Sequence, residues 1–160
     1  MIAAALSIVL WTGGCAEPPL RSAPRTTLPG SADVRSIGPT AARVARSMVG
    51  TPYRHGGDTP AGFDCSGLVR YSFARAGLAG LPHSVRALAR LAHPVPIDSI
   101  HAGDLLFFSG AWLKKKSHVG IYLGNRRFVH APSSGKSVEV VSFDDVYWGP
   151  RVHEAGRLTP

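Results

Sequence analysis

The hydrophobic pattern of this chain changes its period once, and that change constrains the fold more than any other feature. In residues 41–49 and again in 65–76, apolar side chains recur every three to four positions, which is the spacing of amphipathic helices. A third, short helix is expected over 85–92. After Pro94 and Pro96 the apolar residues form short extended runs instead. Helices first and antiparallel strands second predict an α+β fold.

The two longer helices carry residues that favour a start and a stop. Thr40 is expected to cap the first helix, which Gly50 ends. Asp64 is expected to cap the second, and Gly77 ends it. The second helix therefore begins at its cysteine, Cys65.

Five extended segments follow the helices. They cover residues 105–108, 118–123, 128–131, 138–143 and 152–154. The second and third are separated by Gly124-Asn125-Arg126, which is typical of a hairpin turn.

The loop length of this hairpin decides which way two histidines point. A two-residue loop would place His118 and His130 on opposite faces, whereas a three-residue loop, pairing Leu123 with Arg127, places them on the same face. We expect the three-residue loop, with Asn125 or Arg126 left-handed, because it gives one histidine a partner and separates the aliphatic side chains from the others. The shared face then carries His118, Gly120, Tyr122, Phe128 and His130.

The N-terminal segment has the features of a secretory signal. Residues 1–14 hold no charge, and an apolar run over residues 2–11 is followed by small residues and Cys15. That run is far shorter than the roughly 20 residues that span a bilayer. The small residues before Cys15 resemble a bacterial lipoprotein signal, in which the cysteine is acylated and becomes the new N-terminus. The alternative is an ordinary cleavable signal with an incidental cysteine.

Residues 15–39 are expected to form a disordered tether ahead of one folded domain, residues 40–160. Five of the 13 prolines fall in residues 16–39, among scattered polar residues, so this segment has little apolar surface to bury.

The net charge of +8 favours anionic partners. For an exported protein these are cell-wall polymers or lipid headgroups rather than nucleic acid, because no basic motif is interleaved with aromatic residues. The basic run Lys114-Lys115-Lys116 is either part of that attraction or a solvated loop tip.

Cys65 is the candidate nucleophile. At the first turn of a helix its sulfur lies near unpaired backbone N–H groups and the positive end of the helix dipole, which both favour the thiolate. The same N–H groups are suited to hold an oxyanion. The alternative is a buried structural cysteine. However, an unpaired thiol in an exported protein usually has a function.

A nucleophilic cysteine needs a base and a group that orients the base. Of the seven histidines, only His118 and His130 lie in clearly extended apolar segments. Their expected position on one face makes them the candidates.

Six segments together resemble the NlpC family of cell-wall cysteine peptidases. They are Tyr-Arg-His-Gly-Gly at 53–57, Gly-Phe-Asp-Cys-Ser-Gly-Leu-Val at 62–69, Leu-Pro-His-Ser at 81–84, Gly-Asp-Leu-Leu-Phe-Phe at 103–108, His-Val-Gly-Ile-Tyr-Leu-Gly at 118–124 and Phe-Val-His-Ala at 128–131. The resemblance implies a papain-like fold, in which a helix bearing the nucleophile packs on an antiparallel sheet. It makes Cys65 the nucleophile, His118 the general base and His130 the residue that orients His118.

The resemblance also implies a substrate. In this family it is the peptidoglycan stem peptide, commonly cut between γ-D-glutamate and a diamino acid such as meso-diaminopimelate. Tyr53, Asp64 and Ser66 match residues that line the site and contact substrate, and Asp64 is compatible with both this role and that of helix cap. No metal or cofactor is required, and we expect a monomer.

Three other functions stay open. One is a non-catalytic relative that binds wall peptides. Another is a muramoyl-alanine amidase or an acyltransferase with the same three residues. The weakest is a metal site formed by Cys65, His118 and His130, whose spacing is irregular and lacks a clear fourth ligand.

Overall fold

The computed structural model describes residues 34–109 and 116–160. The predicted signal segment, Cys15, residues 15–33 of the expected tether, Lys114 and Lys115 lie outside these residues. Within the described ranges, no helix combines the length and the apolar character needed to cross a membrane.

Three helices and eight strands make up the described part of the chain. The helices are α1 (Val34–Ser47), α2 (Cys65–Arg75) and α3 (Val85–Leu91). The strands are β1 (Asp58–Thr59), β2 (Gly62–Phe63), β3 (His93–Val95), β4 (Leu105–Ser109), β5 (Lys116–Gly124), β6 (Arg127–His130), β7 (Glu139–Ser142) and β8 (Val152–Arg157). Two 3₁₀ turns, η1 (Ile97–Ser99) and η2 (Gly149–Arg151), precede β4 and β8.

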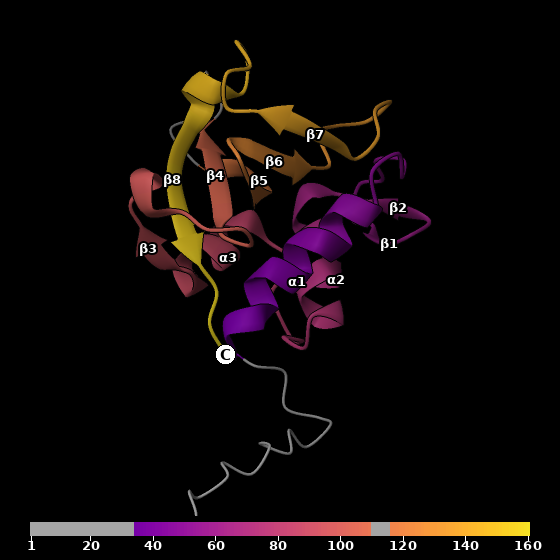
Figure 1. The fold of residues 1–160 in the computed structure, drawn as a ribbon. Helices are drawn as coiled ribbons and strands as arrows, with labels where there is room; N and C mark the ends of the chain where they lie inside the picture. Colours follow the sequence, from indigo (N-terminus) through magenta and orange to yellow (C-terminus); the bar gives the residue numbers. More distant parts are fainter. Residues whose placement is uncertain (1–33, 110–115) are drawn as a thin grey trace, which may run out of the picture. The chain divides into compact units, whose positions relative to one another are not determined.

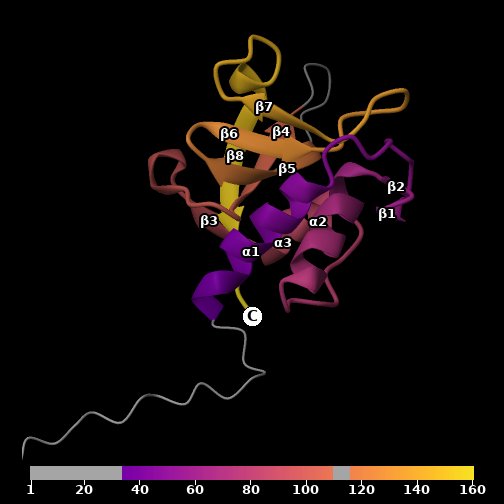
Figure 2. The same cartoon turned by 45° about the vertical axis from the view of Figure 1, so that its right-hand side comes forward.

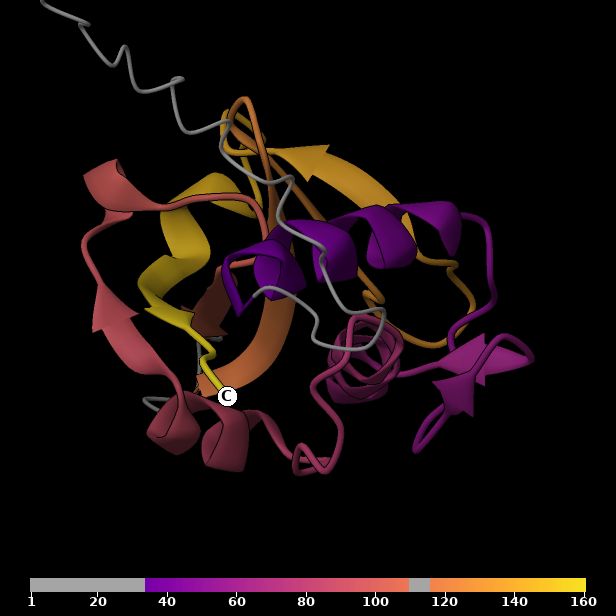
Figure 3. The ribbon, with the colours of Figure 1, turned by 60° about the horizontal axis from the view of Figure 1, so that its bottom comes forward.

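The main sheet is antiparallel throughout and has the strand order β3-β8-β4-β5-β6-β7. Helices α1, α2 and α3 gather on one side of it, and all three contact β5 (Figures 1 and 2). Seen from below, α2 is viewed along its axis with α1 lying across it (Figure 3). Strands β1 and β2 form a separate pair beside the start of α2.

Each face of the sheet buries its own apolar cluster. The larger cluster lies between helices and sheet and includes Leu68, Phe73, Leu105, Phe107, Val119, Ile121 and Val129. The smaller one covers the other face and is built on Leu106, Phe108, Tyr122, Phe128 and Ala155. Each large side chain buried here contributes roughly 1.5–3 kcal/mol, so β5 is fixed from both sides.

The first helix begins at Val34, so the expectation that Thr40 caps it is wrong. Ile37 is only 4% exposed and belongs to the larger core cluster together with Ala41 and Ala45. These three residues are four apart and lie on one helical face. Burial of Ile37 therefore extends the helix back through Pro39 and moves residues 34–39 from the expected tether into the folded domain.

The other two helices confirm their predicted starts. The Asp64 side chain accepts a hydrogen bond from the backbone N–H of Gly67 at 2.7 Å, and Ser84 caps α3. Gly77, just past α2, has a left-handed backbone with φ of 103°. The five predicted strands are present with ends shifted by at most three residues, whereas the short strands β1, β2 and β3 were not predicted.

The hairpin of β5 and β6 has the predicted strand register. Ile121 pairs with Val129, as the three-residue loop requires. A Cβ placed on Gly120 would lie 3.5 Å from the His130 Cβ, so these residues oppose each other. His118 and His130 therefore lie on the same face, as expected.

The turn of this hairpin differs from the prediction. Gly124, not Leu123, pairs with Arg127, and Leu123 is accommodated by an irregularity in the register. The loop therefore has two residues, Asn125 and Arg126, with φ of 51° and 55°. Two left-handed residues give a turn whose twist matches that of the strands, and the bulge preserves the register beyond it.

Candidate active site

The Cys65 sulfur lies where the start of α2 meets β5. It accepts a hydrogen bond from the backbone N–H of Val119, the residue after His118, and is also close to the N–H groups of Ser66 and of Cys65 itself. The close approach of α2 requires Gly67, because a Cβ there would lie 1.9 Å from the Gly57 carbonyl oxygen. The helix start is thus held between the β1 loop and β5.

The thiol of Cys65 is neutral at rest, contrary to the expectation from its helix position. Burial raises its pKa to about 11, and the negative charge of Asp64 acts in the same direction. The N–H groups of Val119, Ser66 and Cys65 lower the pKa as predicted, but burial outweighs them. The position of Cys65 at a helix start predicts that N–H groups lower its pKa, but it does not predict how deeply the sulfur is buried.

His118 and His130 form a hydrogen-bonded pair. The Nε2 atom of His118 lies 2.7 Å from the Nδ1 atom of His130, and the two rings stand at 83° to each other. Burial lowers the pKa of His118 to about 4, partly opposed by Asp64. Burial also lowers the pKa of His130 to about 3, with the charges of His118 and Lys136 adding to the effect. Both rings are therefore neutral near pH 7.

Aromatic side chains hold the two imidazoles. The Trp148 ring centroid lies 5.0 Å from that of His118 and 4.4 Å from that of His130. Phe108 packs against His118 and Phe128 against His130. Sequence reasoning missed Trp148, because it lies in an irregular segment without a periodic pattern.

Asp64 is surrounded by hydrogen-bond donors. Besides the Gly67 N–H, it accepts from the Ser66 hydroxyl at 3.0 Å and from the Gly56 N–H at 3.0 Å. The Nε2 atom of His83 lies 2.9 Å from one oxygen and 3.0 Å from the other. Burial raises the pKa of Asp64, but the bonds from Gly67, His83 and Ser66 outweigh it and hold the pKa below its usual value.

The structure thus places Asp64, Cys65 and Ser66 at the start of α2, with His118 on β5 and His130 on the neighbouring strand β6. Tyr53 and Cys65 both pack against the larger core cluster, and burial raises the pKa of Tyr53. Sequence reasoning missed His83 as a hydrogen-bond partner of Asp64. Its position could have indicated this role, because a histidine in the loop between two helices is able to reach the start of either helix.

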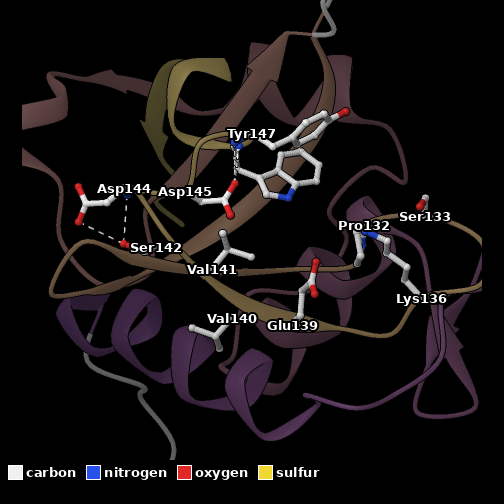
Figure 4. A pocket seen from close by; sticks show the side chains of 11 residues that line it. Pro132, Ser133, Lys136, Glu139, Val140, Val141, Ser142, Asp144, Asp145 and Tyr147 are labelled. Atoms are coloured by element: carbon white, nitrogen blue, oxygen red, sulfur yellow. Dashed lines mark hydrogen bonds between the residues drawn. The ribbon is translucent and has the colours of Figure 1, made fainter.

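One hollow adjoins His118, and a second shares Tyr147 and Trp148 with it. A cavity of about 220 Å³ beside His118 is lined in part by Tyr147, Trp148 and Arg151. Tyr147 and Trp148 also line a groove of about 830 Å³ that runs along β7 (Figure 4). Among residues 34–109 and 116–160, no group of three or more His, Cys, Asp or Glu side chains is arranged to hold a metal ion.

A comparison with models of protein families shows which family this chain belongs to. The model of the NlpC/P60 family matches residues 50–157. The chain belongs to the NlpC/P60 family.

Relatives within the NlpC/P60 family include several endopeptidases. A probable endopeptidase of Mycobacterium tuberculosis is 47% identical over 103 residues, which cover 64% of this chain and 25% of the relative. A probable endopeptidase NlpC homolog of Haemophilus influenzae is 36% identical over 117 residues, 73% of this chain and 61% of the relative. The chain therefore spans about a quarter of the length of the mycobacterial relative.

A solved structure confirms the predicted fold class. The NlpC/p60 domain of the peptidoglycan hydrolase SagA is 30% identical and superposes with a TM-score of 0.66, covering 76% of this chain and 98% of that domain. The papain-like α+β arrangement, in which the helix bearing Cys65 packs on an antiparallel sheet, is that of NlpC/P60 domains.

Proposed function

We propose that this protein is a cysteine endopeptidase that cuts peptidoglycan stem peptides between γ-D-glutamate and a diamino acid such as meso-diaminopimelate. The observation that carries the proposal is the hydrogen-bonded pair of His118 and His130, because the N–H of Val119, the residue after His118, lies close to the Cys65 sulfur. A cysteine, a base and a group orienting that base are the requirements of thiol catalysis. The named relatives support the endopeptidase class.

Relatives differ in the bond that their names specify. A γ-D-glutamyl-L-lysine dipeptidyl-peptidase of Bacillus subtilis is 38% identical over 104 residues. A murein DD-endopeptidase of Escherichia coli is 36% identical over 104 residues. The first relative supports cleavage at the γ-D-glutamyl bond. The second makes a DD-bond the competing site of cleavage.

The reaction starts from the neutral thiol and imidazole. The Cys65 proton passes to His118 as the sulfur attacks the amide carbonyl, which forms a tetrahedral intermediate. The backbone N–H groups of Cys65 and Ser66 lie next to the sulfur and are suited to hold the oxyanion. His118 then protonates the leaving amine, and water hydrolyses the thioester on Cys65.

His130 orients the base in this scheme. Its Nδ1 atom binds the Nε2 atom of His118, so the remaining nitrogen of His118, Nδ1, is the one that serves Cys65. Nδ1 is also the ring nitrogen nearer the backbone, and the next residue, Val119, donates its N–H to the same sulfur.

Asp64 and Tyr53 supply polar groups for binding the substrate beside Cys65. Asp64 is ionised at neutral pH, and its charge is suited to a cationic group of the stem peptide. Ser66 is buried and donates its hydroxyl to Asp64, so it acts by holding that carboxylate. The capping bond to Gly67 uses one oxygen of Asp64 and is compatible with this role.

Digestion of purified sacculi, with products identified by mass spectrometry, tests the proposal. Fragments ending in γ-D-glutamate are expected, and none should appear with Cys65→Ala. Cleavage at the D-alanyl crosslink or at the lactyl-linked alanine would replace the proposed bond by another. If Cys65→Ala cleaves as well as the wild type, the thiol mechanism is wrong, and if the wild type only binds sacculi, the protein is a binding relative.

We further propose that the protein is exported and anchored through a lipid on Cys15. The uncharged apolar segment before Cys15 supports export, and the net charge of +8 suits an anionic wall or membrane surface. Incorporation of labelled palmitate into the wild type and not into Cys15→Ala is the expected result. Equal labelling of both proteins, or of neither, would refute the anchor.

A further inference from the structure

The buried ring of His130 has one nitrogen that the proposed mechanism does not use. Its Nδ1 atom binds His118, whereas its Nε2 atom is buried and makes no hydrogen bond within the described residues. The Oε1 atom of Glu139 lies 3.4 Å from this Nε2 atom. Buried polar atoms without a partner are uncommon, so this contact calls for a function.

The sheet itself sets this contact. His130 on β6 and Glu139 on β7 are directly paired across the two strands, so their side chains leave the same face. In Figure 4, Glu139 and Val141 stand on the side of β7 that faces Tyr147, whereas Val140 points the opposite way. The Glu139 side chain is 42% exposed along the groove, so one carboxylate faces both solvent and the buried ring.

We propose that Glu139 is a positioning residue that selects the tautomers of His130 and His118 in which His118 is able to accept the Cys65 proton. The inference rests on the proposed roles of Cys65, His118 and His130. Glu139 touches neither the sulfur nor the substrate in this proposal; it acts through His130.

The argument follows from counting protons on two neutral rings. Each neutral imidazole has one N–H, and the 2.7 Å contact between the rings uses one N–H as donor and one bare nitrogen as acceptor. Either His118 Nε2 donates to His130 Nδ1, or the reverse. In the first arrangement His118 Nδ1 is bare and is able to take the thiol proton; in the second it already carries a proton.

Glu139 distinguishes these two arrangements. In the first, His130 carries its proton on Nε2 and presents it to the carboxylate oxygen, which is an attraction. In the second, a bare Nε2 faces a carboxylate that has only lone pairs to offer, which is a repulsion. The competent arrangement is therefore the favoured one.

The charge of Glu139 also acts on the intermediate. Proton transfer from Cys65 makes the histidine pair cationic in a buried place, which costs free energy. The titratable groups around His130 are the cationic Lys136, the His118 ring and Glu139. The uncharged rings of Trp148 and Phe128 also pack against it. Glu139 supplies the negative charge among them and offsets the effect of Lys136.

Two substitutions distinguish the role of the Glu139 carboxylate as a hydrogen-bond acceptor from its role in packing. Glu139→Gln keeps the shape but presents either an oxygen or an NH₂ group, so it no longer selects a tautomer. Glu139→Lys presents donors only and favours the wrong arrangement. Asp98→Asn and Asp98→Lys, at an exposed position on η1, make the same charge changes away from the site.

The experiment uses the full chain and two readouts. Nitrogen-15 NMR of the imidazoles at pH 7 should show the proton on Nε2 of both rings in the wild type, a mixture in Glu139→Gln and Nδ1 protonation in Glu139→Lys. The rate of iodoacetamide alkylation, measured on the peptide containing Cys65, should fall about twofold or more in Glu139→Gln and about tenfold in Glu139→Lys. Both Asp98 variants should match the wild type.

Two results would overturn the inference. One is unchanged tautomers in both Glu139 variants, and the other is alkylation of Glu139→Lys within twofold of the wild type. Neither readout uses peptidoglycan, so a protein that fails to cut sacculi but shows the expected tautomer shifts would refute the proposed function and leave the role of Glu139 intact.

Discussion

Replacement of Asp64 by alanine should destabilise the fold far more than the same replacement of the more exposed aspartate Asp58. The change removes the α2 cap and leaves four donors without their acceptor: the N–H groups of Gly67 and Gly56, the Ser66 hydroxyl and the His83 ring. Loss of a cap costs about 1 kcal/mol, and a buried unsatisfied hydroxyl adds about 1–2 kcal/mol. The expected loss is about 2–3 kcal/mol, or roughly 8–12 °C in Tm for a domain of this size.

The matched control is Asp58→Ala. Asp58 pairs with Arg70 at 3.1 Å, but the side chains of Arg70 and Asp58 are 36% and 40% exposed. Exposed pairs of this kind contribute about 0–1 kcal/mol. Thermal unfolding followed by circular dichroism at pH 7 measures both variants. Equal Tm losses in the two variants would refute the assignment of Asp64 as the centre of this hydrogen-bond cluster.

The effect of Asp64 should also depend on pH with a definite sign. Its pKa is lowered in the folded state, so its stabilisation is fully present above the ordinary value of 3.8 and is lost as the pH falls through the lower folded value. The gap in stability between wild type and Asp64→Ala should therefore shrink below about pH 3.8. A gap that grows on acidification would contradict the account.

Three further predictions concern the site and its support. Burial lowers the pKa of His118 to about 4, so kcat/KM should fall on the acid side with a midpoint near pH 4. An acid midpoint near pH 6.5 would show that the His118 ring is not desolvated. Gly67→Ala should destabilise the fold by more than about 3 kcal/mol in urea unfolding, because the added Cβ would overlap the backbone of Gly57. Stability near that of the wild type would mean that the β1 loop is free to move. Ser72→Ala should be neutral or stabilising by up to about 1 kcal/mol, because the Ser72 hydroxyl is buried without a partner among the described residues; a clear loss would reveal a bond to that hydroxyl.

Local rules predicted the elements that carry the site. An aspartate before Cys65 and a glycine after the last apolar position were enough to place α2. The separation of aliphatic from aromatic side chains was enough to place His118 and His130 on one face, because a register shift of one residue would have reversed every side chain. These features depend on neighbours close in sequence.

Features that depend on distant contacts were not predicted. Helix α1 begins at Val34 because Ile37 packs into the core, although the Pro39 that follows suggested a tether. The neutral Cys65 thiol results from burial by β5, which the sequence of α2 does not contain. Trp148 and Glu139 reach the histidine pair only through the folding of β7 and the segment after it.

Mass spectrometry of a reaction quenched in acid tests the central claim most directly. With a stem peptide containing the γ-D-glutamyl–diaminopimelate bond as substrate, the peptide around Cys65 should carry a thioester-linked fragment that ends in γ-D-glutamate. The adduct should be absent with His118→Ala. Hydrolysis of this substrate at full rate by Cys65→Ala, or an acyl group found on another residue, would contradict the account.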